Sequence, residues 1–188
     1  KASAQRVLKI KLDGGQIVER IRSIRTARPG AELIVDANQS WSVDLLTQHG
    51  GELAALGVRM IEQPLPRGQD AALRDLTCPV PIFADESCHV AADVPALVGL
   101  YQGVNIKLDK TGGLTEALAL ARAARAAGMG VMVGCMAGTS LSMAPAYVIA
   151  GLSDWADLDG PLLLAQDRTP PMTYAQGTLA RFAPALWG

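Results

Sequence analysis

The sequence predicts an α/β fold of the closed (β/α)₈-barrel type, with one barrel strand outside these 188 residues. Seven short runs rich in Val, Ile and Leu each end in polar residues, and their end residues recur about every 22 to 28 positions. The segments between the runs have helical patterns, and this alternation is typical of βαβ units. An open doubly wound sheet is the alternative, but KLDGGQ after the first run is no GxGxxG phosphate loop.

The elements follow one another in a regular order. The expected strands are 7–12, 32–38, 59–65, 81–87, 103–109, 130–136 and 156–164. The expected helices are 16–28, 41–56, 70–76, 90–100, 114–127 and 139–150. Isoleucines share one face of the first helix, and strong helix formers fill 114–127 before Gly128. We expect Gly50–Gly51 to interrupt the helix at 41–56.

Composition excludes several classes of protein. The chain is 49% hydrophobic and 19% charged with a net charge of −1, so it is too apolar for disorder and lacks a basic surface for nucleic acid. Three cysteines (Cys78, Cys88 and Cys135) with no CxxC or zinc spacing indicate a reducing, cytoplasmic setting. The charge-free stretch 126–153 contains several Gly and a Pro, so we expect a strand, a loop and a buried helix there, not a membrane span.

Ionisable residues gather at the carboxyl ends of the expected strands, where (β/α) barrels carry their active sites. Successive strands contribute Lys9 with Lys11, Asp36, Glu62, Asp85 and Lys107, and the seventh segment contains Asp157 and Asp159. Lys9 and Lys11 are two residues apart, so their side chains point to the same side of the strand. Taken singly, each carboxylate could be a helix cap or half of a surface ion pair, and the two lysines could face solvent on an edge strand.

The combination of groups predicts a metal-assisted proton transfer. Three carboxylates on successive strands repel one another, and oxygen ligands without histidine favour a hard divalent cation such as Mg²⁺. A lysine acts as a base when burial, a nearby cation or a second lysine lowers its pKa, and Lys9 is a second lysine beside Lys11. Removal of a proton α to a carboxylate creates an enediolate, whose charge a bound Mg²⁺ would stabilise.

The ordered motifs KxK, Asp-Ala-Asn, Glu-Gln-Pro, Ala-Asp-Glu-Ser and Asn-Ile-Lys followed by KTGG resemble the enolase superfamily, muconate-lactonizing-enzyme subgroup. The resemblance implies a (β/α)₇β barrel and a Mg²⁺ cofactor. It also implies that Asp36, Glu62 and Asp85 are metal ligands and that Lys11 and Lys107 are the two acid/base catalysts. Lys9 would help to bind the substrate carboxylate. Two lysines on opposite faces of the substrate suit racemisation or epimerisation.

The segment Asp157-Leu158-Asp159 resembles the dipeptide epimerases, where such a pair holds the α-ammonium of the substrate. Two anions would suit a cationic amine, although they could instead cap a turn or pair with an arginine. Cys135 occupies a position where family members contact substrate, but a thiol there could simply pack. The expected reaction is a 1,1-proton transfer on a dipeptide, with L-Ala-D/L-Glu from cell-wall peptide recycling as the first candidate.

Other hypotheses about the function fit the same residues. Muconate cycloisomerase, o-succinylbenzoate synthase and N-acylamino-acid racemase share the lysine pair, and a truncated, non-catalytic barrel is a further alternative. Residues 1–165 are expected to form barrel strands two to eight. Residues 166–188 are expected to return to an N-terminal capping domain that is absent here, which would leave Phe182, Leu186 and Trp187 without their contacts. Expected partners are a small-molecule substrate, the missing N-terminal portion and, through unpaired strand edges, another copy of the chain, with no nucleic acid and no membrane.

Overall fold

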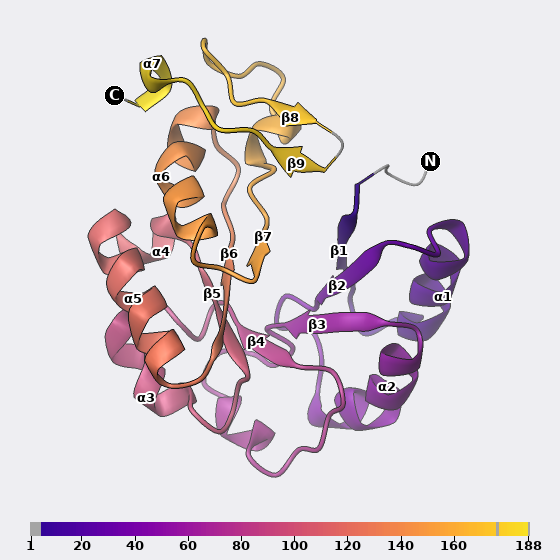
Figure 1. Ribbon diagram of the computed structural model, residues 1–188. Coiled ribbons are helices and arrows are strands. Elements are labelled where there is room, and N and C mark those ends of the chain that lie inside the picture. The colour runs from indigo at the N-terminus through magenta and orange to yellow at the C-terminus, as the bar shows by residue number, and fades with distance from the viewer. Residues whose placement is uncertain (1–4, 176, 188) are drawn as a thin grey trace. The chain divides into compact units, whose positions relative to one another are not determined.

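The computed structural model describes residues 5–175 and 177–187, which divide into two compact units (Figure 1). Unit 1 comprises the residues up to Ser87 together with Gly99–Gln102. Unit 2 comprises Cys88–Val98 and the residues that follow Gln102. The first six predicted apolar runs each coincide with a strand, and the seventh overlaps one only at Ala156, so the repeat of strands found in the sequence is confirmed.

Unit 1 contains a parallel sheet of four strands in chain order. They are β1 (Val7–Lys11), β2 (Glu32–Asp36), β3 (Val58–Glu62) and β4 (Ile82–Ala84). The strand register aligns Lys11 with Asp36 and Asp36 with Glu62. The ionisable residues that end these strands therefore lie side by side at one edge of the sheet.

The helices of unit 1 are α1 (Ile17–Ala27), α2 (Val43–Ala55) and the short 3₁₀ helix η1 (Asp70–Leu73). Helix α1 buries Ile17 and Ile21, as its apolar pattern predicts. Helix α2 runs without a break through Gly50 and Gly51, so the predicted interruption is wrong. A Cβ atom on Gly50 would lie 3.0 Å from Cys78 Sγ, and close packing is therefore the physical reason for glycine at this helical position.

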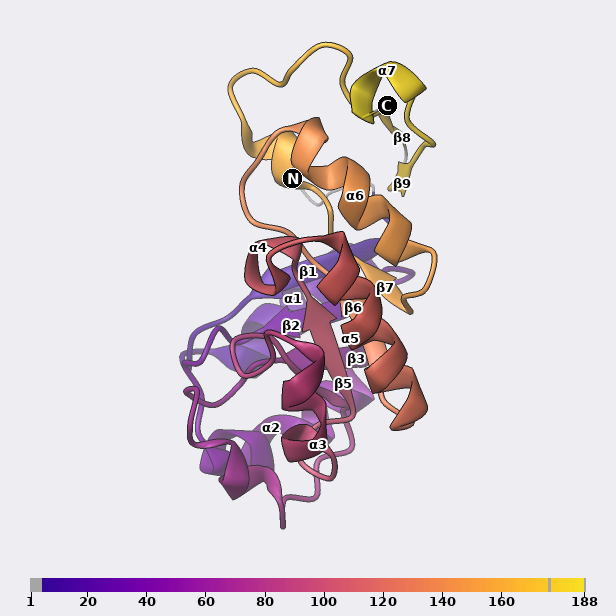
Figure 2. The same cartoon turned by 90° about the vertical axis from the view of Figure 1, so that its left-hand side faces the viewer.

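Unit 2 contains three parallel strands, β5 (Gly103–Ile106), β6 (Gly130–Val133) and β7 (Trp155–Ala156). Its helices are η2 (Ala91–Asp93), α3 (Val94–Leu97), α4 (Leu108–Thr111), α5 (Leu114–Ala126) and α6 (Ser140–Ala150). Helix α5 runs beside β6 (Figure 2) and packs against β5, β6 and α6. Its buried residues are mostly alanine. In the part of the chain that the structure describes, no helix is both long enough and apolar enough to cross a bilayer.

The predicted strand at 156–164 is mostly wrong. Strand β7 ends at Ala156, and the 3₁₀ helix η3 (Gly160–Leu163) follows after a short loop. Pro161 has no backbone N–H to donate to a neighbouring strand, and its fixed φ suits the first turn of a helix. Asp157 and Asp159 consequently lie in a loop beyond the end of β7.

The C-terminal segment forms the hairpin β8 (Tyr174–Ala175) and β9 (Thr178–Leu179) and the short helix α7 (Pro184–Trp187). The Phe182 ring meets Tyr147 of α6 edge-on at a centroid distance of 5.6 Å and Trp187 at 6.2 Å. Leu186 is only 3% exposed. The expectation that these side chains would lack contacts is therefore wrong for Phe182 and Leu186, because α6 and α7 pack together within unit 2, whereas Trp187 is 42% exposed.

Candidate active site

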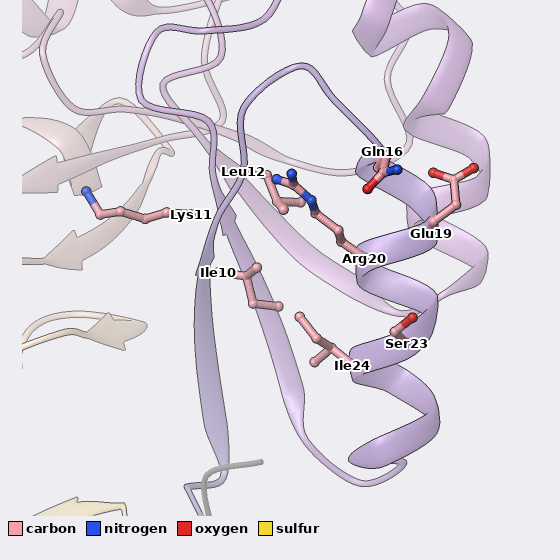
Figure 3. A pocket seen from close by; sticks show the side chains of 8 residues that line it. All are labelled: Ile10, Lys11, Leu12, Gln16, Glu19, Arg20, Ser23 and Ile24. Carbon is pink, nitrogen blue, oxygen red and sulfur yellow. The ribbon is translucent and has the colours of Figure 1, made fainter. Parts of the chain in front are cut away.

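The carboxyl-terminal edge of the unit 1 sheet holds a compact group of opposite charges. The Lys9 ammonium lies 3.1 Å from Asp36 Oδ2 and 3.0 Å from Glu62 Oε2. Lys11 Nζ approaches the same Asp36 oxygen at 3.5 Å, which confirms that the two lysines share one side of β1. Figure 3 shows Lys11 extending away from α1, whereas Ile10 and Leu12 point toward that helix.

The carboxylates of this group are buried and electrostatically linked. Glu62 is 0% exposed, and Asp36 and Asp85 are each 2% exposed. The pKa of Glu62 is raised to about 7, mainly by burial and with smaller contributions from the charges of Asp36 and Asp85, while Lys9 opposes the shift. Buried anions this close together are costly without a compensating cation, and Lys9 supplies part of that positive charge.

Asn38 completes the edge of the group and was not predicted to have a role, although it lies in the Asp-Ala-Asn motif. Its backbone has φ 47°, in the left-handed region that Asn tolerates. This turn lets the Asn38 N–H donate to Asp36 Oδ1 at 3.0 Å, while Asn38 Oδ1 accepts from Lys11 Nζ at 3.3 Å. Its amide also donates to Glu86 Oε1 at 2.8 Å, so Asn38 holds Asp36 and Lys11 from one side.

The donor set fits a hard divalent cation by its chemistry. Three buried carboxylates offer oxygen ligands from the ends of β2 and β3 and from the residue after β4. Within residues 5–175 and 177–187, however, no three His, Cys, Asp or Glu side chains are already arranged to hold a metal ion. Two of the three carboxylates instead contact the Lys9 ammonium.

A cavity of about 450 Å³ lies between β1 and α1 (Figure 3). Its lining side chains come from the end of β1, from the segment between β1 and α1, and from α1 itself: Ile10, Lys11, Leu12, Gln16, Glu19, Arg20, Ser23 and Ile24. None of the predicted metal ligands belongs to this lining. The cavity is therefore not the predicted metal site.

Unit 2 brings together the remaining predicted site residues. The pKa of the Cys135 thiol is raised to about 11, mainly by burial, although a hydrogen bond from the Gly160 N–H lowers it. The charges of Asp157 and Asp159 contribute to the rise and the charge of Lys107 opposes it, so these side chains lie near one another. At neutral pH the Cys135 thiol is protonated, which argues against a role as nucleophile.

The loop that carries Asp157 and Asp159 is tied down at its centre. The Tyr174 hydroxyl donates to the Leu158 carbonyl at 2.6 Å, and the Leu158 side chain is buried. A Cβ atom on Gly160 would lie 2.7 Å from the Met136 carbonyl, so this loop packs tightly on the loop after β6. Tyr174 was not predicted, since its place in the C-terminal hairpin gives no signal of proximity to residue 158.

Gly134 provides the space in which Lys107 lies. A Cβ atom there would approach Asn105 side-chain atoms to 2.8 Å and Lys107 Cε to 3.1 Å. Asn105 is fully buried and cannot move aside, so we expect Gly134→Ala to displace Lys107 and to lower activity by at least about tenfold. Turnover measurement checks this, with Gly151→Ala as the control because its Cβ atom would meet only Val148 O at 3.5 Å. Unchanged turnover for Gly134→Ala would contradict a catalytic role for Lys107 in the position described.

Comparisons with known proteins show which family the chain resembles. The profile of the family "Enolase C-terminal domain-like" matches residues 1–182. The chain is 53% identical over 174 residues to L-Ala-D/L-Glu epimerase of Escherichia coli K12, covering 93% of this chain and 54% of that protein. It is 49% identical over 182 residues to N-acetyl-D-glutamate racemase of a Pseudoalteromonas species, covering 97% and 58%. The chain thus spans a little more than half the length of these curated relatives.

The chain is also similar in structure to a solved protein of this kind. The dipeptide epimerase of Methylococcus capsulatus, complexed with Mg and the dipeptide L-Arg-D-Lys, superposes with a TM-score of 0.87 at 38% identity. The match covers 93% of this chain and 52% of that protein. With its parallel strands, its strand-end carboxylates and lysines and the match over residues 1–182, the chain belongs to the enolase C-terminal domain-like family.

Proposed function

We propose that the protein is a Mg²⁺-dependent epimerase that inverts a stereocentre α to a carboxyl group in dipeptides. The observation that carries the proposal is the buried Asp36–Lys9–Glu62 group with Lys11 beside it at the strand ends of unit 1. The identity to L-Ala-D/L-Glu epimerase supports dipeptides, with L-Ala-D/L-Glu in peptide recycling as the first candidate. We also propose that the chain supplies strands of a (β/α)₇β barrel.

The chemistry needs two proton-transferring groups. Lys11 and Lys107 are proposed to act as this pair, one removing the α-proton and the other returning a proton to the opposite face. The Lys11 side chain is 70% exposed, and its ammonium group contacts Asp36 at 3.5 Å and Asn38 at 3.3 Å. Lys107 passes close to Gly134 in unit 2, where only a glycine leaves room for it.

Asp36, Glu62 and Asp85 are proposed to hold Mg²⁺, and the complex of a related epimerase with Mg supports this choice. When bound, Mg²⁺ supplies positive charge that stabilises the negative charge developing on the substrate carboxylate. Lys9 contributes a second positive charge beside Asp36 and Glu62, and we propose that it also helps to bind the substrate carboxylate. Asn38 keeps Asp36 oriented through its backbone N–H.

Asp157 and Asp159 are proposed to bind the free α-ammonium of the dipeptide. They lie in a loop that Tyr174 and Gly160 hold in place. Cys135 lies beside them as a protonated thiol, and we propose that it lines the substrate site without transferring protons. We place the protein in a reducing compartment such as the cytoplasm, since Cys78, Cys88 and Cys135 are all free.

N-acetyl-D-glutamate racemisation is the second candidate, because the identity to that racemase extends over 97% of this chain. An N-acyl substrate has no free ammonium, so it does not need a pair of carboxylates at its nitrogen. The two candidates therefore differ in what they require of Asp157.

Asp157→Asn decides between these candidates. The variant should lose about 10²-fold or more in kcat/KM for L-Ala-L-Glu, because a charge-assisted contact to the ammonium is lost. Chiral chromatography of the whole protein's products from L-Ala-L-Glu and from N-acetyl-D-glutamate measures both activities. Activity on N-acetyl-D-glutamate alone, unaffected by Asp157→Asn, would reject the dipeptide proposal. Asp154→Asn is the matched control, since Asp154 pairs with Arg125 on the surface of unit 2.

A further inference from the structure

Gln63 joins the three segments that carry the predicted metal ligands. It directly follows Glu62, its backbone N–H donates to the Phe83 carbonyl of β4 at 2.8 Å, and its own carbonyl accepts from the Gln39 N–H at 2.8 Å. Gln39 lies three residues after Asp36, and Phe83 lies two before Asp85. One buried residue thus connects the ends of β2, β3 and β4 through its main chain.

The side chain of Gln63 reaches the backbone of the Asp85 segment directly. Its Oε1 accepts from the Asp85 N–H at 2.9 Å and from the Ser87 N–H at 3.1 Å. Its Nε2 lies at hydrogen-bond distance from the Leu65 carbonyl, at 2.9 Å, and from the hydroxyls of Ser87 and Tyr101, at 3.0 and 3.1 Å. Every polar atom of this fully buried amide is used.

Asp70 determines which way the Gln63 amide points. Its Oδ1 accepts the hydroxyl protons of both Ser87 and Tyr101, and its Oδ2 accepts from the Gly68 N–H at 3.1 Å. Because both hydroxyl protons point to Asp70, the hydroxyl oxygens face Gln63 as acceptors. The two Nε2 protons are shared among these oxygens and the Leu65 carbonyl. The hydroxyl oxygens would repel Oε1, so Oε1 must face the N–H groups of Asp85 and Ser87. The chain of contacts therefore runs from Asp70 to the backbone of Asp85.

Placing Gln63 at this position costs free energy that a purely apolar, unstrained residue would not. Gln63 has φ 34°, which is strained for a residue with a side chain, and it buries a complete amide. Asp70 is a carboxylate kept ionised: although burial would raise its pKa, the hydrogen bonds from Ser87 and Tyr101 hold it below its usual value. The contacts around Gln63 offset these costs.

We propose that Gln63 is the positioning residue for the metal site, and that Asp70, through Tyr101 and Ser87, fixes the amide orientation with which Gln63 holds Asp85 beside Glu62. The inference rests on the proposed function, because it takes Asp36, Glu62 and Asp85 as the cation ligands. Neither Gln63 nor Asp70 touches the cation in this proposal, and both act through the backbone that carries a ligand. Groups that orient metal ligands are typically worth 10- to 100-fold in metal affinity.

The test is Mn²⁺ binding to the whole protein, followed by electron paramagnetic resonance of the free ion. Asp70→Ala and Tyr101→Phe leave the Gln63 side chain in place, so they keep the fold more readily than a change at Gln63 itself. Each should raise the Kd for Mn²⁺ by about tenfold, and Gln63→Leu by more. Asp154→Ala is the matched control, since Asp154 likewise accepts a backbone N–H, from Val131 at 2.9 Å, but far along the chain in unit 2. Its Kd should stay within about twofold of the parent value.

Amide hydrogen exchange gives a second readout that does not need the metal. The N–H groups of Asp85 and Ser87 should exchange faster in Asp70→Ala and Tyr101→Phe than in Asp154→Ala, because the Gln63 amide is free to turn. Unchanged exchange of these two amides, or faster exchange with an unchanged Kd, would overturn the positioning role. A parent protein that binds no Mn²⁺ would overturn the metal site, and this inference with it. Only that outcome also contradicts the proposed function.

Discussion

Replacing Lys11 or Lys107 with alanine is expected to lower epimerisation by about 10²- to 10⁴-fold in both directions, because each direction needs one lysine to take a proton and the other to return one. Exchange of the α-proton with solvent deuterium should behave differently. In each variant the remaining lysine can still remove and return a proton on its own face. Exchange should therefore persist for one epimer of the dipeptide and be lost for the other.

The two variants should retain exchange with opposite epimers. Mass spectrometry of L,L- and L,D-dipeptides after incubation in D₂O measures this, and the double variant Lys11→Ala/Lys107→Ala serves as the control without either group. Loss of exchange with both epimers in only one of the single variants would point to one acid/base group instead of two. Retained epimerisation in either variant would remove that lysine from the mechanism.

Replacing Arg25 with methionine is expected to lower the free energy of unfolding by about 3 kcal/mol, although Arg25 has no predicted catalytic role. Its guanidinium lies at hydrogen-bond distance from backbone carbonyls on two separate loops. These acceptors are Leu56, Arg28, Pro29, Ala31 and Gly57, at 2.8, 3.3, 3.0, 2.6 and 3.3 Å. A methionine keeps the apolar stem but leaves these carbonyls, of which all but that of Pro29 are part-buried, without their charged donor.

Arg22→Met on the same helix is the matched control. Arg22 pairs with Glu52 through exposed side chains, and such surface pairs contribute little, so its loss should cost less than about 1 kcal/mol. Urea unfolding followed by circular dichroism compares the two variants. An equal decrease in the free energy of unfolding for Arg22→Met and Arg25→Met would contradict the prediction that the carbonyl contacts of Arg25 stabilise the fold.

Most of the strands, and the gathering of lysines and carboxylates at the strand ends of unit 1, could be predicted from the sequence because both follow from local patterns. Asp36 and Glu62 each end an apolar run, and parallel pairing in register then places them side by side. Lys9 and Lys11 share a side because of the two-residue strand period, which needs no tertiary information. Their common contact with Asp36 Oδ2 follows from these simple rules.

What the sequence could not predict depends on contacts between distant segments. Gln63 lies in the predicted Glu-Gln-Pro motif, but its hydrogen bonds to Asp85 and Tyr101 span 22 and 38 residues. Tyr174 and Phe182 likewise meet residues far earlier in the chain. Gly50 reads as a helix breaker in the sequence because the sequence does not show Cys78 packed against it. In these cases contacts between distant segments decide the structure, and local sequence propensities do not reveal such contacts.

The central claim is Mg²⁺-dependent removal of the α-proton from a dipeptide. The most direct measurement is mass spectrometry of pooled L,L-dipeptides after incubation of the whole protein in D₂O, with added Mg²⁺ and, separately, with a chelator. We predict a gain of about one dalton, as expected for one exchanged proton, in a subset of dipeptides. That gain should be absent with the chelator and in the double variant Lys11→Ala/Lys107→Ala. No mass gain in any dipeptide, or a gain that persists without divalent cation, would contradict the claim.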